Sequence, residues 1–445
     1  MFDRTGFNIN KSSIRVAGFL LALSLLCLQK TSAQEKKEKN NGDISTEVVA
    51  HDRDAIFSSS AYFTFSVHNP TGKDEAGTVS YVVTTEKGEK VADKVQSVKI
   101  SQNSNENYDF HLPEMKTGFY KINFMINVSD YDDTTRRAFG IKADEIRPET
   151  GKPADFDEFW QNTKAELAKV APNFKVTPLP KKNTDNREVY QFQMQSLDNY
   201  TVSGYMTIPK TKNKNRKFSV LLGLPGYQVS VDPMLGLDND LAIITIDVRG
   251  QGNSRDGIDT RRDEYISYRL EDKNKYVMRG VIMDCVRCID FIYSRPNLKH
   301  DNILVTGGSM GGYLALVVAG VDKRVNLCSA QNPILCDIRA LEGATDWPIS
   351  AFKKYVATQP GLTMDKVLSN MDYYDAKNFA PNITCPTLMG IGLLDPFAPP
   401  GDEYATFNEI PGKKHIMVFK NLAHEINQKY KDYEGRWMRD TFALF

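Results

Sequence analysis

The chain has 445 residues, which is long enough for two or three domains, and its 41% hydrophobic content provides for a sizeable core. Lysine plus arginine equals aspartate plus glutamate, at 56 each, so the formal net charge is zero. This balance excludes any charge-based reason to expect nucleic acid or an anionic membrane surface as a partner.

The N-terminus has the features of an export signal. Basic residues precede an apolar run over residues 16–28, and a small-x-small sequence ends at Ala33. The run is too short for a membrane span, so we expect residues 1–33 to be a cleaved signal peptide. Lipidation of Cys27 is disfavoured because Leu26 stands where a small residue is needed. No later segment approaches the ~20 apolar residues of a span, so we predict a periplasmic or extracellular protein.

Five cysteines follow the signal, and an odd, sparse set in a long chain is not typical of a disulfide framework. Cys285 and Cys288 form a C-x-x-C pair inside the apolar helical pattern of residues 279–294. No second cysteine pair or nearby histidine completes a metal site. We therefore interpret the pair as core packing.

Residues 34–43 are charged and lack apolar side chains, which predicts a flexible leader. Short alternating segments then fill residues 44–145, with turn signals between them. This pattern predicts a small all-β domain, an immunoglobulin-like sandwich. It could bind glycan, pack on the rest of the chain or act as a spacer, and packing or spacing is favoured because the segment has no obvious row of exposed aromatic residues. The expected strands cover residues 61–67, 78–84, 94–100 and 120–128.

Residues 146–445 alternate apolar strands with helical patterns, which indicates an α/β domain with a mostly parallel, doubly wound sheet. A helix is expected over residues 156–170, followed by antiparallel strands. In such sheets the active site gathers at the carboxyl ends of the strands. The strands are expected at residues 189–196, 200–209, 218–223, 241–247, 303–308, 326–330, 386–392 and 415–419.

The segment Gly307-Gly308-Ser309-Met310-Gly311 fits Gly-x-Ser-x-Gly between an apolar strand and an apolar helix. This is the setting of the nucleophile elbow of α/β-hydrolases, where glycines leave room for a serine with a strained backbone. Unpaired N–H groups at the start of the helix can stabilise an oxyanion. The five residues alone also fit a structural turn, so the hypothesis depends on a base and an acid elsewhere.

In this fold the triad runs serine, then acid, then histidine. Two histidines follow Ser309. His415 opens a strand and is interpreted as edge structure, whereas His424 lies in the loop after that strand, where the base is expected. Asp395 follows the preceding apolar strand and is the favoured acid, with Asp402 as the alternative.

A second oxyanion donor is expected in the loop after the strand at 218–223. The backbone N–H groups of Tyr227 and Met310 form the predicted oxyanion hole, although Tyr227 taken alone also fits an ordinary turn. Arg249 and Gln251, in an Arg-Gly-Gln-Gly segment, are interpreted as site support that braces a loop by hydrogen bonds.

With these motifs in order, residues 148–445 resemble the acetyl xylan esterase/cephalosporin-C deacetylase family, carbohydrate esterase family seven. The matching segments are the Arg-Gly-Gln-Gly run at 249–252, the elbow at 307–311 and the pair His424-Glu425; FDEFW and NITCPTLMGIGLLDPFAPP are also similar. The resemblance implies hydrolysis of acetyl esters on xylan fragments, other acetylated sugars or small esters. It implies no metal or organic cofactor, and a possible homo-oligomer.

Three positions depart from this family. Met310 stands where glutamine is usual, Pro225 where histidine is usual, and residues 396–398 are Pro-Phe-Ala in place of a small polar loop. All three changes are expected to make the pocket less polar.

The predicted reaction is ester hydrolysis through an acyl-enzyme, with attack by Ser309, acid–base catalysis by His424, and Asp395 orienting the imidazole. Two alternatives stay open: a serine peptidase of the prolyl-oligopeptidase kind, and a non-catalytic glycan-binding protein. The β region is too short for the propeller that such peptidases usually carry. Turnover of acetyl esters against peptides tests the first alternative, and the Ser309→Ala variant tests the second.

Overall fold

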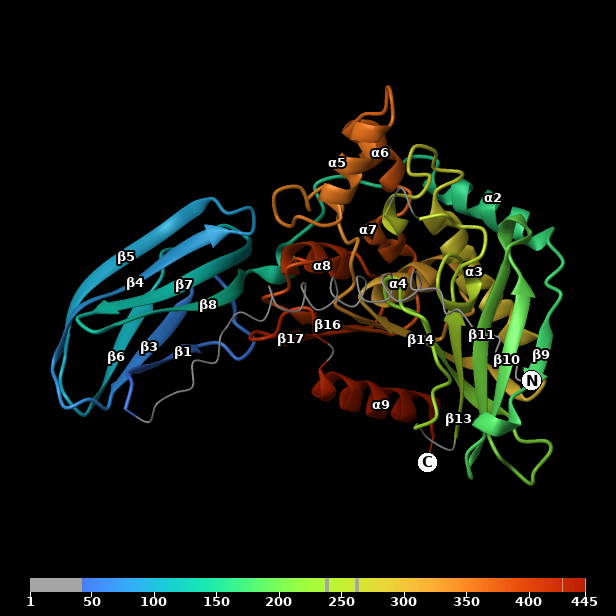
Figure 1. The fold of residues 1–445 in the computed structure, drawn as a ribbon, viewed down its shortest axis with the longest axis horizontal. Coiled ribbons are helices and arrows are strands. Elements are labelled where there is room, and N and C mark those ends of the chain that lie inside the picture. Colours follow the sequence, from blue (N-terminus) through green and yellow to red (C-terminus); the bar gives the residue numbers. More distant parts are fainter. Residues whose placement is uncertain (1–41, 237–239, 261–263, 426, 445) are drawn as a thin grey trace, which may run out of the picture.

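The computed structural model places two folded regions side by side (Figure 1). The predicted signal peptide, with Cys27 and Ala33, and all but two residues of the predicted leader lie outside the described residues. The structure describes residues 42–236, 240–260, 264–425 and 427–444.

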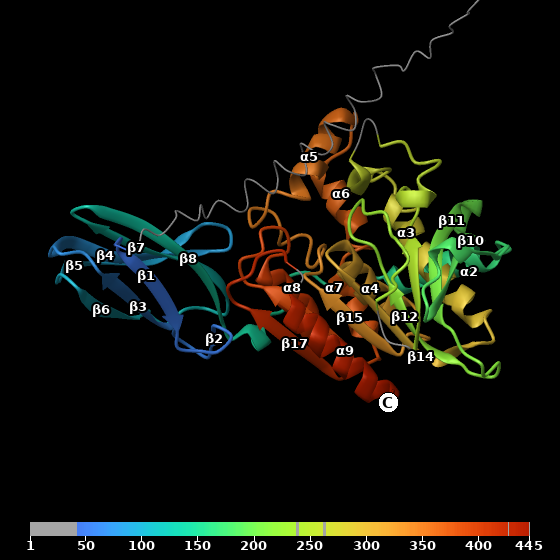
Figure 2. The same cartoon turned by 60° about the horizontal axis from the view of Figure 1, so that its bottom comes forward.

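The first region, residues 45–141, consists of two β-sheets that face each other (Figure 2). We call it the N-terminal sheets. Strands in the first sheet run in the order β1-β3-β6 and those in the second in the order β2-β8-β7-β4-β5. The bounds are β1 (Ser45–Ala50), β2 (Ile56–Phe57), β3 (Tyr62–Asn69), β4 (Glu75–Thr85), β5 (Lys90–Ile100), β6 (Ser104–His111), β7 (Gly118–Val128) and β8 (Tyr131–Ile141).

Aromatic side chains fill the space between these two sheets. The rings of Phe63 and Phe65 on β3 lie 5.3 and 5.8 Å from that of Phe124 on β7. Strand alternation places these residues inward, because successive side chains point to opposite faces. The four expected strands correspond to β3, β4, β5 and β7, whereas β1, β2, β6 and β8 were not predicted.

The second region is built on a nine-stranded sheet in the order β17-β16-β15-β14-β12-β13-β11-β10-β9. Strands β12 to β17 are parallel to their sheet neighbours among themselves, and β9 to β11 add an antiparallel edge, so the expectation of a mostly parallel sheet is confirmed. The bounds are β9 (Lys175–Pro178), β10 (Arg187–Gln195), β11 (Thr201–Pro209), β12 (Phe218–Gly223), β13 (Leu241–Asp247), β14 (Leu298–Gly308), β15 (Leu327–Gln331), β16 (Thr387–Gly392) and β17 (Lys414–Phe419).

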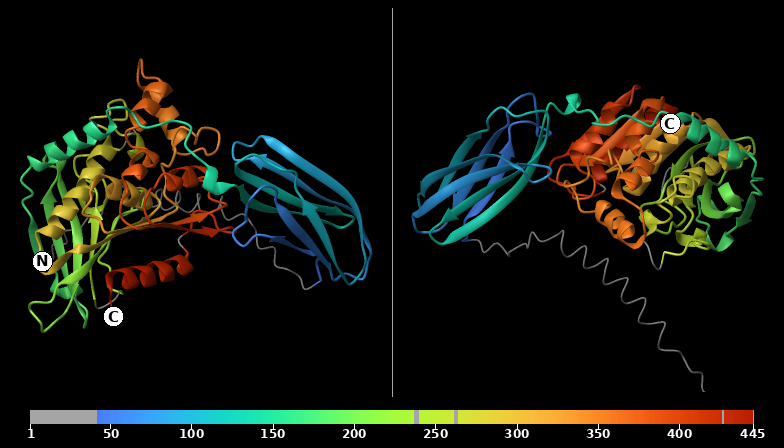
Figure 3. Two further views of the ribbon diagram at one scale, coloured as in Figure 1. Left: turned by 180° about the vertical axis from the view of Figure 1, so that it is seen from behind. Right: turned by 90° about the horizontal axis from the view of Figure 1, so that it is seen from above.

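Helices cover both faces of this sheet (Figures 1 and 3). On one face α9 packs Met438 and Phe442 against Leu221 and Leu304. The other described helices lie on the opposite face, where α3 and α4 are almost wholly buried. The bounds are α2 (Phe156–Ala168), α3 (Val277–Tyr293), α4 (Met310–Val321), α5 (Ile349–Thr358), α6 (Met364–Met371), α7 (Ala376–Phe379), α8 (Pro400–Asn408) and α9 (Gln428–Phe442).

The cysteine interpretation is confirmed. Cys285 and Cys288 lie on α3. These two and the three other cysteines of the described residues are all buried and carry free thiols. Burial raises the pKa of both thiols, which keeps them protonated. Within the ranges that the structure covers, no helix combines the length and apolar character that crossing a bilayer requires.

The N-terminal sheets contact the second region through α8. The Phe119 ring on β7 lies 5.2 Å from that of Tyr404 on α8. Glu86, at the β4–β5 turn, accepts a 3.2 Å hydrogen bond from the Gly401 backbone N–H in the first turn of α8. An apolar contact and a polar one therefore fix the sheets next to the carboxyl end of β16.

Candidate active site

Ser309 occupies the sharp turn between β14 and α4. Its backbone has φ 58° and ψ −121°, a positive φ that side chains with a Cβ adopt only when the surroundings hold them there. The Ser309 N–H donates to the Gln331 carbonyl at 2.9 Å, which anchors the turn to the end of β15. A Cβ on Gly311 would lie 2.4 Å from the Leu224 carbonyl oxygen, so glycine is required for this approach. The turn has the geometry that the elbow prediction demands.

The structure brings His424 and Asp395 together. The imidazole Nδ1 lies 2.6 Å from one carboxylate oxygen of Asp395. The other oxygen accepts hydrogen bonds from the backbone N–H groups of Phe397 and Ala398 at 2.8 and 3.0 Å. The Asp395 side chain is fully buried and that of His424 is 21% exposed, so the acid is fixed and the imidazole still reaches solvent. Because Nδ1 is engaged, Nε2 is the ring nitrogen free to exchange a proton with a nucleophile.

Asn332 joins the loops that carry this pair, and sequence reasoning missed it. Its amide nitrogen donates to the Glu425 carbonyl at 3.0 Å, and its amide oxygen accepts from the Gly392 N–H at 3.1 Å. A Cβ on Gly392 would lie 2.2 Å from the Ala423 carbonyl oxygen, so the histidine loop packs directly on β16. Its position in the sequence is the signal that could have indicated Asn332, since it is a polar residue directly after β15, at the carboxyl edge of the sheet.

The loop that carries Tyr227 lies against the elbow. A Cβ built on Gly226 would be 4.0 Å from the Gly308 carbonyl oxygen. The Tyr227 hydroxyl accepts from the Ile266 N–H at 3.1 Å, and its ring packs 5.3 Å from that of Trp347. Burial raises the pKa of Tyr227 to about 12, so the phenol stays neutral near pH 7. The side chain thus anchors the loop, which leaves the backbone as the part that can serve the site.

Arg249 ties the loop after β13 to helix α3. Its guanidinium donates to both carboxylate oxygens of Asp284, at 3.0 and 2.7 Å, and to the Leu197 carbonyl at 3.0 Å. Gln251 lies under the elbow, with its amide nitrogen 3.9 Å from the sulfur of Met310. Both side chains are buried, and these contacts are the kind that a bracing role requires.

Neither of the two weaker candidates is bonded to this pair in the described part of the chain. His415 is exposed on β17, where its ring lies 5.3 Å from that of Tyr433. Asp402 is buried in α8, and burial raises its pKa well above the ordinary range, whereas the hydrogen bond from His424 goes to Asp395.

A mostly parallel sheet, a serine elbow after a central strand and an acid–histidine pair after the next strands define an α/β-hydrolase. The model of the acetyl xylan esterase family (AXE1) matches residues 141–441. The chain belongs to this family, and it is a serine carboxylic ester hydrolase of the acetyl esterase type.

Individual relatives agree with the family match. The chain is 31% identical over 313 residues to the acetyl esterase Axe7A of Xylanibacter ruminicola, an alignment that covers 67% of this chain and 70% of that protein. A solved acetyl xylan esterase from Paenibacillus sp. R4 is 27% identical, with a TM-score of 0.62, over 67% of this chain and 98% of that one. The acetyl xylan esterase 1 of Thermoanaerobacterium sp., at 24% identity and a TM-score of 0.62, shares the fold.

These comparisons favour neither the peptidase nor the glycan-binding alternative. The family match begins at residue 141, at the end of β8, so the N-terminal sheets lie almost wholly outside it.

Proposed function

We propose that the chain removes acetyl groups from xylan fragments or other acetylated sugars, with Ser309 as nucleophile, His424 as base and Asp395 as its partner. The 2.6 Å hydrogen bond that fixes His424 to the buried Asp395 carries the proposal. A buried carboxylate on Nδ1 holds the imidazole in the tautomer that a serine hydrolase needs.

In the proposed reaction the Ser309 hydroxyl oxygen attacks the acetyl carbonyl while Nε2 of His424 takes its proton. The N–H groups of Tyr227 and Met310 hold the oxyanion, and the sugar oxygen leaves with the proton from His424. A water molecule then attacks the acetyl-serine, with His424 again as base. Acetate leaves, and the proton returns to Ser309.

The packing around the elbow shows which of the positions that depart from the family can contact a substrate. The Met310 side chain is fully buried against Gln251, so it acts on the packing beneath the elbow. Phe397 is 36% exposed, and its ring stands edge-on 5.3 Å from the His424 imidazole. Phe397 is therefore the departure best placed to touch the substrate.

We also infer that the N-terminal sheets are an immunoglobulin-like sandwich domain and that the protein is exported. The face-to-face sheets with an aromatic core support the first inference. The basic, apolar and small-residue order before Ala33 supports the second. Sequencing the N-terminus of the mature protein tests export, with a first residue of Gln34 expected.

The test of the function is acetate release by the purified protein from acetylated xylo-oligosaccharides, beside p-nitrophenyl acetate and a peptide substrate. We expect turnover of both esters and none of the peptide. Ser309→Ala should lower ester kcat by about 10⁴-fold or more, because the nucleophile is lost. Ser101→Ala, at an exposed serine of the N-terminal sheets, is the matched control. Peptide cleavage without ester cleavage would overturn the proposal.

A further inference from the structure

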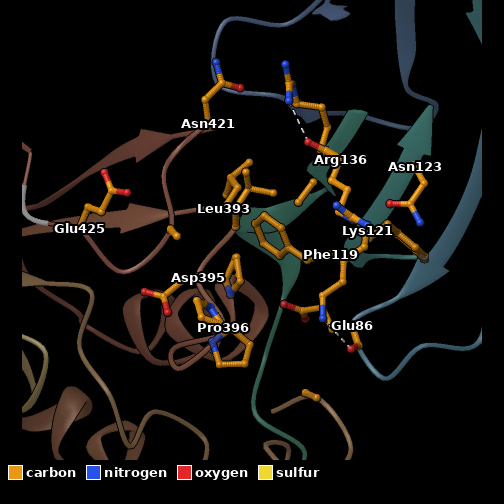
Figure 4. A pocket seen from close by; sticks show the side chains of 18 residues that line it. Glu86, Phe119, Lys121, Asn123, Arg136, Leu393, Asp395, Pro396, Asn421 and Glu425 are labelled. Atoms are coloured by element: carbon orange, nitrogen blue, oxygen red, sulfur yellow. Dashed lines mark hydrogen bonds between the residues drawn. The ribbon is translucent and has the colours of Figure 1, made fainter. Parts of the chain in front are cut away.

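A cleft of about 780 Å³ lies between the N-terminal sheets and the second region (Figure 4). One wall is the outer face of β7 and β8. The other wall is formed by the loops after β16 and β17, including the backbone of Asp395 and the residues on either side of His424. The cleft therefore adjoins the two loops that carry the proposed acid and base. Its volume lies in the range of roughly 300–1,000 Å³ that is usual for ligand sites.

The wall from the N-terminal sheets is held firmly in place. Phe119 is buried against Tyr404, and Glu86 accepts from the Gly401 N–H. Lys121, two residues after Phe119 on the same face of β7, donates to the Glu86 carbonyl at 3.2 Å. These contacts fix the wall at the edge of the cleft without filling the cleft.

Cationic and amide side chains line one wall of the cleft, beside the Glu86 carboxylate, and an amide and a carboxylate line the other wall. Lys121 and Asn123 on β7 and Arg136 on β8 share one face, since Asn123 and Arg136 are direct neighbours in the strand register. Across the cleft lie Asn421 and Glu425 (Figure 4). Arg136 is exposed, and among the described residues no acceptor is found for its guanidinium, whereas the neighbouring Arg137 donates from Nη1 to the Arg136 carbonyl at 2.8 Å.

This lining suits a hydroxylated ligand. Each sugar hydroxyl both donates and accepts a hydrogen bond, so a chain of sugars can bond to the cationic, amide and carboxylate groups of both walls at once. A small ester such as p-nitrophenyl acetate has no hydroxyl groups with which to make these hydrogen bonds. The wall also belongs to the part of the chain that the acetyl xylan esterase family model does not cover.

We propose that this cleft binds the sugar chain that carries the acetyl ester, and that Lys121, Asn123 and Arg136 contact it. This inference rests on the proposed function. It gives the N-terminal sheets a part in substrate selection: they favour acetylated oligosaccharides of several units over acetylated monosaccharides and small esters.

The experiment compares kcat/KM for acetylated xylotetraose with kcat/KM for p-nitrophenyl acetate, using the full-length mature protein. In Arg136→Ala and in the Lys121→Ala/Arg136→Ala double variant, we expect the ratio of these values to fall about tenfold, mainly through KM for the tetraose. Lys99→Ala, which removes an exposed cation from β5 in the same sheet, should leave the ratio unchanged. In the unaltered protein, KM should fall as the acetylated chain lengthens from one to four sugars.

An unchanged ratio in both variants, or a KM independent of chain length, would overturn the cleft proposal while acetate release still supports the esterase function. If the unaltered protein releases no acetate from any acetylated sugar but still hydrolyses the small ester, the proposed substrate class is wrong, and the cleft proposal fails with it.

Discussion

The two regions of this molecule differ in how they use polar groups. In the α/β region, buried polar side chains are bonded to fixed partners around the elbow, as in the Asp395–His424 and Arg249–Asp284 pairs. In the N-terminal sheets the space between the sheets is filled mainly by apolar side chains, although Asn69 and Glu75 are buried, and most of the polar side chains lie toward solvent or the cleft. Under the proposals above, the chemistry belongs to one region, and the other changes substrate preference without altering the reaction.

The largest expected effect is a loss of kcat from a substitution in the α/β region that leaves the N-terminal sheets unchanged. Asp395→Asn should lower kcat for every ester by roughly 10³–10⁴-fold, because the amide no longer holds the imidazole in the productive tautomer. Asp402→Asn is the matched control and should cost less than about tenfold in kcat, as Asp402 is not bonded to His424. Steady-state kinetics on p-nitrophenyl acetate measure both, and a greater loss in Asp402→Asn would reassign the acid.

The next effect is on stability. Arg249→Met should lower the free energy of unfolding by about 3–5 kcal/mol, because it leaves the Asp284 carboxylate buried without its partner. Arg53→Met, at a pair whose arginine is 95% exposed, should change it by less than about 1 kcal/mol. Urea unfolding followed by circular dichroism measures the difference. Adding Asp284→Leu to Arg249→Met should recover part of the loss, and equal stability of the two arginine variants would contradict the bracing role.

The smallest effect concerns the contact between the regions. Burial raises the pKa of Glu86 from 4.5 to about 7, although its bond from the Gly401 N–H opposes the shift. Because the folded state then binds the extra proton, this group's contribution to stability is full below pH 4.5 and is lost as the pH rises to about 7. Glu86→Gln should therefore reduce the fall in the free energy of unfolding across this pH window, by on the order of 3 kcal/mol.

Thermal unfolding at pH 4.5, 6 and 7.5 checks this expectation. Glu89→Gln, at an exposed glutamate of the same turn, is the control and should keep the original slope. Buried Asp402 and Glu403 also have raised pKa values, caused chiefly by burial, so part of the slope should remain in both variants. If stability falls with pH equally steeply in Glu86→Gln and in the unaltered protein, the Glu86 carboxyl does not cause the pH dependence.

The sequence predicts the α/β region well because its strands are buried on both faces and read as continuous apolar runs. β13 has the predicted bounds, and the elbow, Asp395 and His424 occupy the expected positions on the sheet. β6, with the sequence SNENYDFH, exposes alternate polar residues, and its contribution to the core depends on Phe110 meeting the facing sheet. Such a strand is specified by its tertiary partners, so its own sequence does not predict it.

Contacts between distant segments were also beyond prediction. Asn332 links two loops that lie far from it in the chain, and Glu86 meets the first turn of a helix more than 300 residues later. The sequence treats Met310 and the Pro-Phe-Ala segment alike, as changes that make the pocket less polar, whereas in the structure the Met310 side chain is buried beneath the elbow and Phe397 stands beside the imidazole. Side-chain direction at a turn depends on the packing around it.

Covalent labelling tests the central claim most directly. The protein should react with one equivalent of a serine-reactive fluorophosphonate, and mass spectrometry of the digested product should locate the label on the peptide that contains Ser309. Loss of esterase activity should parallel labelling, and Ser309→Ala should take up no label. A label on another residue, or a fully labelled protein that still releases acetate, would contradict the account.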